Sequence, residues 1–131
     1  MPMFTPVIPE GAPTPIAPFV PGSRVGDTLY VAGMLALGPN GESLHTGDVK
    51  AQTRYVIEEI LRVVKASGGD LSDICYNAIF LKNRDDYAAF NEVYAEYFGK
   101  NPPARYCIIS ELVREELLVE IATTAYFGQP G

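Results

Sequence analysis

Two charged side chains stand within otherwise apolar stretches of this sequence, where they could act on a small anion. Arg105 opens an apolar run after Asn101-Pro102-Pro103-Ala104, and Glu120 lies in the middle of the apolar stretch 117–122. A charge in such surroundings is costly unless it is paired, hydrogen-bonded or in contact with a ligand. Arginine is the side chain best shaped to hold a carboxylate through two parallel hydrogen bonds, and glutamate can order a water and exchange protons with it. The two residue types are therefore candidates for a site that binds a small carboxylate and orders a water beside it.

The residue types and their spacing are also compatible with purely structural roles. Arg105 and Glu120 could pair with each other, or each could reach water from an outward-facing strand position. Cys107 stands two positions after Arg105 and so shares its sheet face, where a thiol is either a proton donor or a packed neighbour. Asn91, beside an aromatic stripe, is either a polar lining group or a solvent-facing helix residue.

The elements that must position these residues are predicted from the periodicity of apolar side chains. A helix is expected over 48–67, with Asp48 as its N-terminal cap and Gly68-Gly69 at its end. A second helix over 83–98 carries an aromatic stripe that is typical of a core face. Strands are expected over 28–36, 73–82, 105–110 and 117–126, with 24–25 pairing with the first strand and a charged turn at 114–116 joining the last two. This order predicts a single α+β domain over residues 1–131 with both helices on one sheet face.

The outside of this domain has two further features. Seven of the eleven prolines lie within the first twenty-two residues, so this segment is predicted to be an extended arm without a helix or a central strand. The sheet face opposite the helices would carry the alternate positions of 29–35 and 118–124, which are too apolar for water. A partner subunit would supply the cover that this face needs.

The composition restricts the classes of function. With 16 acidic against 10 basic residues, the net charge of -6 offers no attraction to phosphate backbones, so no nucleic-acid partner is expected. No apolar stretch is long enough to span a bilayer and no basic-apolar leader stands at the start, so we expect a cytoplasmic protein without membrane attachment. Cys75, Cys107 and His45 show no zinc-ligand spacing, and two distant cysteines are typical of free thiols in a reducing compartment.

Short motifs that run over nearly the whole chain form a recognisable series. They are Ala17-Pro18-Phe19-Val20-Pro21-Gly22, Tyr30-Val31-Ala32-Gly33, Lys50-Ala51-Gln52-Thr53-Arg54, Asn91-Glu92-Val93-Tyr94, Pro103-Ala104-Arg105-Tyr106-Cys107 and Val119-Glu120-Ile121-Ala122. In this order they resemble the Rid (YjgF) family of enamine/imine deaminases. Within that family, segments 17–22, 51–54 and 91–98 are most similar to the aminoacrylate deaminases of pyrimidine degradation.

The resemblance implies a homotrimer with a chorismate-mutase-like α+β fold, a mixed sheet, and ligand sites in the clefts between neighbouring subunits. At the matching positions, it implies that Arg105 clamps the substrate carboxylate and that Glu120 positions or activates the hydrolytic water. The remaining residues that it places along the cleft are Asn91, Cys107 and Gly33. It implies no metal and no organic cofactor.

Two positions depart from the family pattern. Many members carry tyrosine where Phe19 stands and serine where Ala32 stands, so roles that require those hydroxyls are not carried over. Phe19 would instead form an apolar wall of the site.

The implied reaction is the hydrolysis of 3-aminoacrylate at its C–N bond. The enamine takes a proton on carbon, water attacks the resulting imine, and ammonia leaves to give malonic semialdehyde. One alternative within the family is deamination of 2-aminoacrylate or 2-iminopropanoate. A different class of function would be a non-catalytic small-ligand-binding protein or a translation-inhibiting ribonuclease, although the acidic charge balance counts against RNA as a partner.

Overall fold

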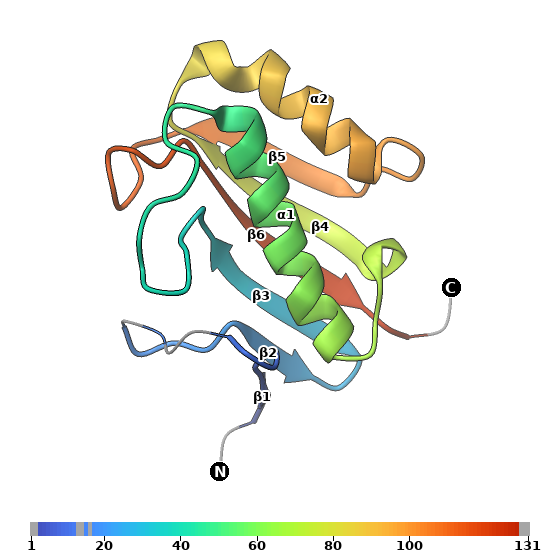
Figure 1. Ribbon diagram of the computed structural model, residues 1–131. Helices are drawn as coiled ribbons and strands as arrows, with labels where there is room; N and C mark the ends of the chain where they lie inside the picture. The colour runs from blue at the N-terminus through green and yellow to red at the C-terminus, as the bar shows by residue number, and fades with distance from the viewer. Residues whose placement is uncertain (1–2, 13–14, 16, 129–131) are drawn as a thin grey trace.

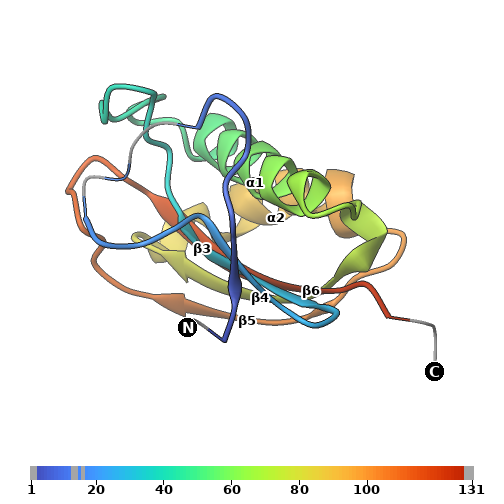
Figure 2. The same cartoon turned by 90° about the horizontal axis from the view of Figure 1, so that it is seen from below.

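Two helices lie side by side on one face of a six-stranded sheet in the computed structural model, which describes residues 3–12, 15 and 17–128 (Figures 1 and 2). The strands are β1 Thr5–Val7, β2 Gly22–Val25, β3 Thr28–Met34, β4 Ile74–Leu81, β5 Ala104–Ile109 and β6 Val119–Tyr126. The helices are α1 Val49–Ala66 and α2 Tyr87–Phe98, with 3-10 turns at Leu71–Asp73 and Arg84–Asp86. The predicted α+β class and the placement of both helices on one face are confirmed.

The bounds of α1 follow from its capping residues. Asp48 Oδ1 accepts a hydrogen bond from the Ala51 backbone N–H at 3.0 Å, and Gly68 takes a φ of 91° just after the last turn. Such a positive φ is costly for a residue with a side chain, which is why glycine stands there. The core-facing side chains of α1 pack on β3 and β6 and are mainly aliphatic: Val49, Val56, Ile57, Ile60, Leu61, Val63 and Val64.

The sheet is mixed, in the order β1-β2-β3-β6-β4-β5. The only parallel pair of neighbouring strands is β4 and β5, and the segment that contains α2 connects them. All other neighbouring pairs are antiparallel. The last two strands, which the charged turn joins, are therefore not neighbours: β4 lies between them, and β5 forms an edge of the sheet.

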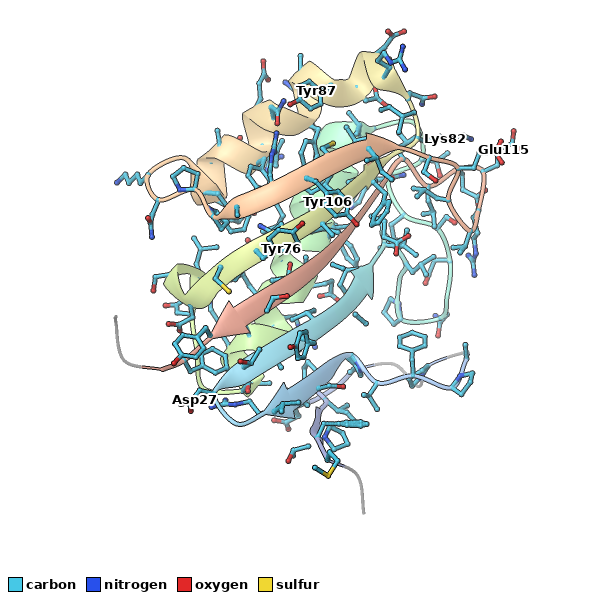
Figure 3. All side chains as sticks on the ribbon, turned by 180° about the vertical axis from the view of Figure 1, so that it is seen from behind. Asp27, Tyr76, Lys82, Tyr87, Tyr106 and Glu115 are labelled. Carbon is cyan, nitrogen blue, oxygen red and sulfur yellow. The ribbon has the colours of Figure 1, made fainter. Side chains whose placement is uncertain are left out.

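The sheet face opposite the helices is apolar and exposed (Figure 3). Tyr76 and Tyr106 lie on it edge to face, with their ring centroids 6.2 Å apart. The other large exposed apolar side chains of this face are Val25, Tyr30, Ile108 and Tyr126. The alternate positions expected from 118–124 do lie on this face, as Glu120, Ala122 and Thr124. Those expected from 29–35 do not, because the pleat of β3 turns Leu29 and Val31 toward the helices, where they are buried.

The proline-rich segment contains one short strand that was not predicted. β1 pairs with β2 and forms the outer edge of the sheet. Proline has no backbone N–H to donate to a second neighbouring strand, so the proline at position 6 is tolerated at this edge. The rest of the described arm has neither helix nor strand, and its positions 13–14 and 16 lie outside the described residues. Within the described part of the chain, neither helix has the length and apolar character to cross a membrane.

Candidate functional site

Arg105 lies on the edge strand β5 with its side chain turned toward α2. In the β4–β5 ladder it stands beside Asn77, whose side chain is buried under the helices. The guanidinium Nη2 donates to Asn91 Oδ1 at 2.9 Å and to the Tyr87 hydroxyl at 3.3 Å. Its Cζ lies 4.6 Å from the centroid of the Tyr94 ring. Asn91 is thus a partner of Arg105 rather than a helix residue that faces only solvent.

The partners of Arg105 are neutral oxygens and aromatic faces. Among the described residues, the ion pairs are made by other side chains, and none of them includes Arg105. The hydrogen bonds of its guanidinium to described residues use Nη2 alone, which leaves the donors on Nε and Nη1 for a ligand. A partly buried guanidinium with free donors and no acidic partner is suited to a planar carboxylate.

Cys107 shares the sheet face of Arg105, as strand alternation predicts. It stands beside Ile79 in the β4–β5 ladder and packs against the hydrophobic core. Burial raises the pKa of the Cys107 thiol, and the charge of nearby Arg105 lowers it by a smaller amount. The thiol is therefore protonated at neutral pH, so Cys107 is a packed neighbour with a proton to give and not a thiolate nucleophile.

Glu120 lies on the open face of the sheet, because Val119 and Ile121 on either side of it are buried toward the helices. Its carboxylate occupies space above the irregular end of β3, where a Cβ on Gly33 would come within 2.2 Å of Glu120 Oε2. Gly33 is therefore required for the close approach of this carboxylate. The two residues therefore form one cluster.

The environment of Glu120 favours proton exchange. Burial raises the pKa of this carboxyl group above its ordinary value, and no hydrogen bond or ion pair to a described residue opposes that shift. A carboxylate with a raised pKa is a stronger base than an exposed one and has lone pairs free to order a water.

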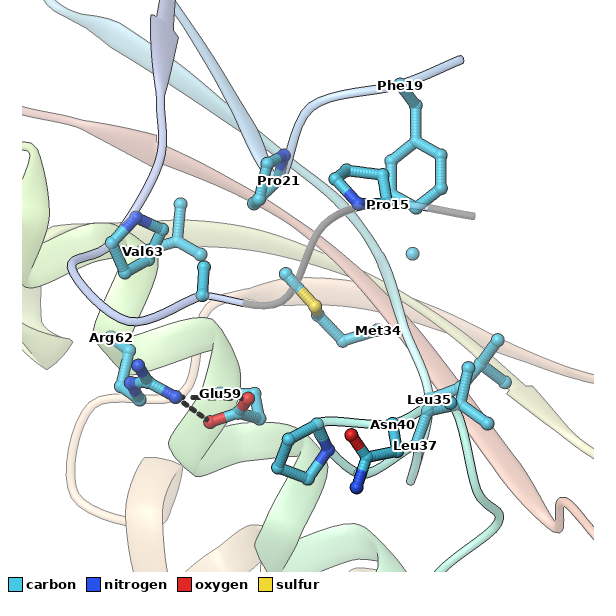
Figure 4. Close-up of a pocket in the computed structure, with 16 residues that line it drawn as sticks. Pro15, Phe19, Pro21, Met34, Leu35, Leu37, Asn40, Glu59, Arg62 and Val63 are labelled. Carbon is cyan, nitrogen blue, oxygen red and sulfur yellow. Dashed lines mark hydrogen bonds and ion pairs between the residues drawn. The ribbon is translucent and has the colours of Figure 1, made fainter. Parts of the chain in front are cut away.

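A groove of about 470 Å³ opens between the N-terminal arm, the segment after β3 and α1 (Figure 4). Phe19 and Gly33 both line it, and Met34 projects into it (Figure 4). Phe19 is 51% exposed, and its ring faces the groove from the arm. An ion pair of 3.0 Å between Arg62 and Glu59 borders the groove on α1. Phe19 thus shares this groove with Gly33, and neither Glu120 nor Arg105 is among the described residues that line it.

Arg105 and Glu120 do not meet within one chain. Arg105 faces the helices and Glu120 the opposite side of the sheet. Their strands are also separated by β4, which makes roughly 10 Å across the sheet. The structural ion pair that the sequence left open is therefore excluded. A site that uses both residues has to draw them from two copies of the chain.

Sequence reasoning missed two tyrosines that contact Arg105. The aromatic stripe of α2 was assigned to the core, which is right for Phe90 and for the ring of Tyr94, at 0% and 6% exposure. Tyr87 and Tyr94 stand four residues before and three after Asn91, however, and such positions share one helix face. The spacing of two tyrosine hydroxyls around one asparagine was the sequence signal that could have indicated their place beside Asn91 at the site.

The described residues hold no group of three or more His, Cys, Asp or Glu side chains arranged to bind a metal ion. His45 lies in the loop before α1, as predicted, with a φ of 53° and an exposed side chain.

Comparison with known proteins identifies the family of the chain. A family model described as Endoribonuclease L-PSP matches residues 9–127. The protein named 3-aminoacrylate deaminase RutC from Acinetobacter baylyi is 46% identical over 120 residues, which is 92% of this chain and 95% of that protein. The chain belongs to the Rid (YjgF) family. Its membership, predicted from the series of motifs, is confirmed.

Solved structures of Rid-family proteins superpose closely on the chain. The yjgF gene product of E. coli is 28% identical with a TM-score of 0.82, covering 93% of this chain and 98% of that one. E. coli TdcF, solved with bound serine, is 30% identical with a TM-score of 0.80, covering 91% and 97%. The strand order and helix placement of the chain are thus those of the Rid fold.

Proposed function

We propose that this protein is an enamine/imine deaminase that hydrolyses 3-aminoacrylate to malonic semialdehyde and ammonia, as a step of pyrimidine degradation. The observation that carries the proposal is the near-full-length relative of 46% identity whose name states this activity. It is supported by Arg105, a partly buried guanidinium with free donors and no acidic partner among the described residues. The serine bound to the related TdcF supports a small ligand with a carboxylate.

The reaction requires that the substrate carboxylate is held in place and that protons are transferred to the substrate and from the attacking water. Arg105 would hold the substrate carboxylate through two hydrogen bonds, which fixes the enamine relative to the catalytic groups. The carbon next to the carboxylate takes a proton, so that the C=C bond becomes a single bond and the C–N bond an iminium. Water then adds to the iminium carbon and loses a proton to Glu120. The amino group takes a proton and leaves as ammonia while the hydroxyl group loses its proton to water, and the aldehyde of malonic semialdehyde remains.

The site is proposed to lie between subunits of a homotrimer. Arg105, with Asn91 and Cys107 beside it, would come from one subunit, and Glu120, with Gly33 and Phe19, from its neighbour. This division follows from the opposite sheet faces of Arg105 and Glu120. The exposed aromatic face offers an apolar surface for the assembly (Figure 3).

The direct test is ammonia release from 3-aminoacrylate generated in the assay, measured against its spontaneous hydrolysis. The same assay with 2-aminoacrylate separates the two family activities, because the products are malonic semialdehyde and pyruvate. A higher kcat/KM for 2-aminoacrylate would replace the proposed substrate. No rate above the spontaneous one for either substrate would favour a binding role, and RNA cleavage would then be assayed because the family model carries the name of an endoribonuclease.

A trimer is expected in solution at micromolar concentration. Light scattering measures it, and a stable monomer would remove the inter-subunit site. Tyr106→Asp places a charge in the exposed aromatic face and should dissociate the assembly and abolish turnover. Ser72→Asp, which adds the same charge to the exposed turn before β4, should change neither.

Gly33→Ala is expected to reduce turnover by displacing the carboxylate of Glu120. The new Cβ would lie 2.2 Å from Glu120 Oε2, so the flexible end of that side chain must move. Because the clash involves no backbone, the thermal midpoint should change little while kcat falls. The same substitution in a Glu120→Gln chain should cause little additional loss, since the effect is exerted through the carboxylate. Equal losses in both backgrounds would mean that Gly33 acts independently of Glu120.

A further inference from the structure

The core beneath Arg105 contains polar side chains that take no part in the proposed deamination mechanism. Asn77 and Thr123 are only 1% and 3% exposed, on the neighbouring strands β4 and β6. Thr123 Oγ1 donates to Asn77 Oδ1 at 2.7 Å, and Asn77 Nδ2 donates to the Tyr94 hydroxyl at 2.9 Å. Buried polar groups cost free energy unless they are paired, and apolar side chains of similar size would fill this space without that cost. A fully paired polar chain at this place therefore points to a role beyond packing.

This chain of hydrogen bonds ends at the Tyr94 hydroxyl, and the ring of Tyr94 lies against Arg105. In the sheet register Thr123, Asn77 and Arg105 stand side by side on β6, β4 and β5. Tyr94 extends from α2 onto this row, so that its hydroxyl is held by Asn77 while its ring faces the guanidinium, with Arg105 Cζ 4.6 Å from the ring centroid. Phe98 packs against the Tyr94 ring, with centroids 4.6 Å apart. The ring is thus fixed both at its hydroxyl and by packing.

We propose that Thr123, Asn77 and Tyr94 are positioning residues that set the orientation of the Arg105 guanidinium for the substrate carboxylate. This inference rests on the proposed function, in which Arg105 is the carboxylate clamp. A carboxylate bound through two parallel hydrogen bonds requires a defined plane of the guanidinium. The ring of Tyr94, 4.6 Å from Arg105 Cζ, restrains the guanidinium from one side, and the hydrogen bond to Asn91 restrains Nη2. Asn77 and Thr123 do not contact the guanidinium and act on it indirectly, because their hydrogen bonds hold the hydroxyl of Tyr94 in place.

Tyr94→Phe tests the proposal because it keeps the aromatic ring and removes the hydroxyl that accepts the hydrogen bond from Asn77. The KM for 3-aminoacrylate and the Kd for malonate should rise together about tenfold, within the range of coupling between members of one hydrogen-bonded network, while kcat changes less. Tyr97→Phe is the matched control. The Tyr97 hydroxyl, on the same helix, bonds Glu58 on the exposed side, and its loss should leave both constants unchanged.

A second variant separates positioning from folding. Thr123→Val, Asn77→Leu and Tyr94→Phe together replace the whole chain of hydrogen bonds by apolar groups, so no buried polar atom of the network is left unpaired. This variant should fold and still show the raised KM and Kd. Wild-type constants in the folded triple variant would overturn the proposal and leave the network a purely structural role.

A double-mutant cycle decides whether the effect is exerted through Arg105. In an Arg105→Lys background, which has no guanidinium plane to orient, Tyr94→Phe should change KM less than twofold, a departure from additivity that marks coupled residues. The same tenfold rise in both backgrounds would overturn the proposal. Wild-type constants for Arg105→Lys alone would refute the carboxylate clamp itself, whereas a defective Arg105→Lys beside a normal Tyr94→Phe would refute only the positioning role.

Discussion

Arg105→Ala is expected to lower kcat/KM for 3-aminoacrylate by two to four orders of magnitude while the chain still folds. Two charge-assisted hydrogen bonds of roughly 1.5–3 kcal/mol each would be lost, and each 1.4 kcal/mol corresponds to about a tenfold change. The partners that the guanidinium leaves, Asn91 and the exposed Tyr87, remain in reach of water. The thermal midpoint should therefore shift by only about 5 °C or less, equivalent to roughly 1 kcal/mol.

Arg105→Lys distinguishes charge from geometry. Lysine keeps the positive charge but presents a single ammonium group in place of a planar fork, so most of the loss should remain. Steady-state rates of ammonia release and calorimetric binding of malonate measure both variants. Arg84→Ala, which removes an exposed arginine from the turn before α2, serves as the control and should behave as the wild type. Wild-type rates in Arg105→Ala would show that the substrate carboxylate is held elsewhere.

The extent to which the sequence predicts this fold depends on whether a signal is local. α1 was predicted within a residue or two, because Asp48 and the glycine after the last turn specify its ends by short-range hydrogen bonding and backbone conformation. The strand order could not be read in the same way. The pairing of β5 with β4 and of β6 with β3 depends on contacts between segments far apart in the chain, on which local periodicity carries no information.

The same distinction applies to the candidate site. Strand alternation predicts that Arg105 and Cys107 share a face, because both belong to one strand. Whether Arg105 and Glu120 share a face depends on the register of β5, β4 and β6 together, and a one-residue shift would reverse the answer. The position of Tyr94 was missed for a related reason: a buried tyrosine has both a ring that packs and a hydroxyl that needs a partner, and only the fold shows Asn77 below it.

The separation of the two charges onto opposite sheet faces affects how they can be tested. If one subunit supplies Arg105 and its neighbour Glu120, an inactive Arg105→Ala chain and an inactive Glu120→Gln chain should restore partial activity when they are refolded together. Some mixed trimers would then contain one cleft with both native residues. That result would show that binding of the carboxylate and activation of water are separable, with the second function assigned to Glu120 in the proposed mechanism.

Glu120→Gln is expected to reduce deamination by on the order of a hundredfold or more, the usual contribution of a positioned acid or base. Glutamine keeps the size of the side chain and much of its hydrogen bonding but removes the charge and the basicity. The substrate carboxylate should still dock on Arg105. Binding of malonate should therefore survive within about tenfold, or about 1.4 kcal/mol. Calorimetry and ammonia release on the same preparation separate the two effects.

The pH dependence of this reaction shows whether Glu120 acts as a base or as an acid. Burial raises the pKa of its carboxyl group above the usual glutamate value. If the carboxylate is the base that activates water, it must be ionised, so kcat/KM corrected for spontaneous hydrolysis should fall as the pH falls through that raised pKa. If the protonated acid were the active form, the rate would rise in the same range. In Glu120→Gln this limb should disappear, and full activity in that variant would make Glu120 a structural residue, with Cys107 as the next proton donor to replace.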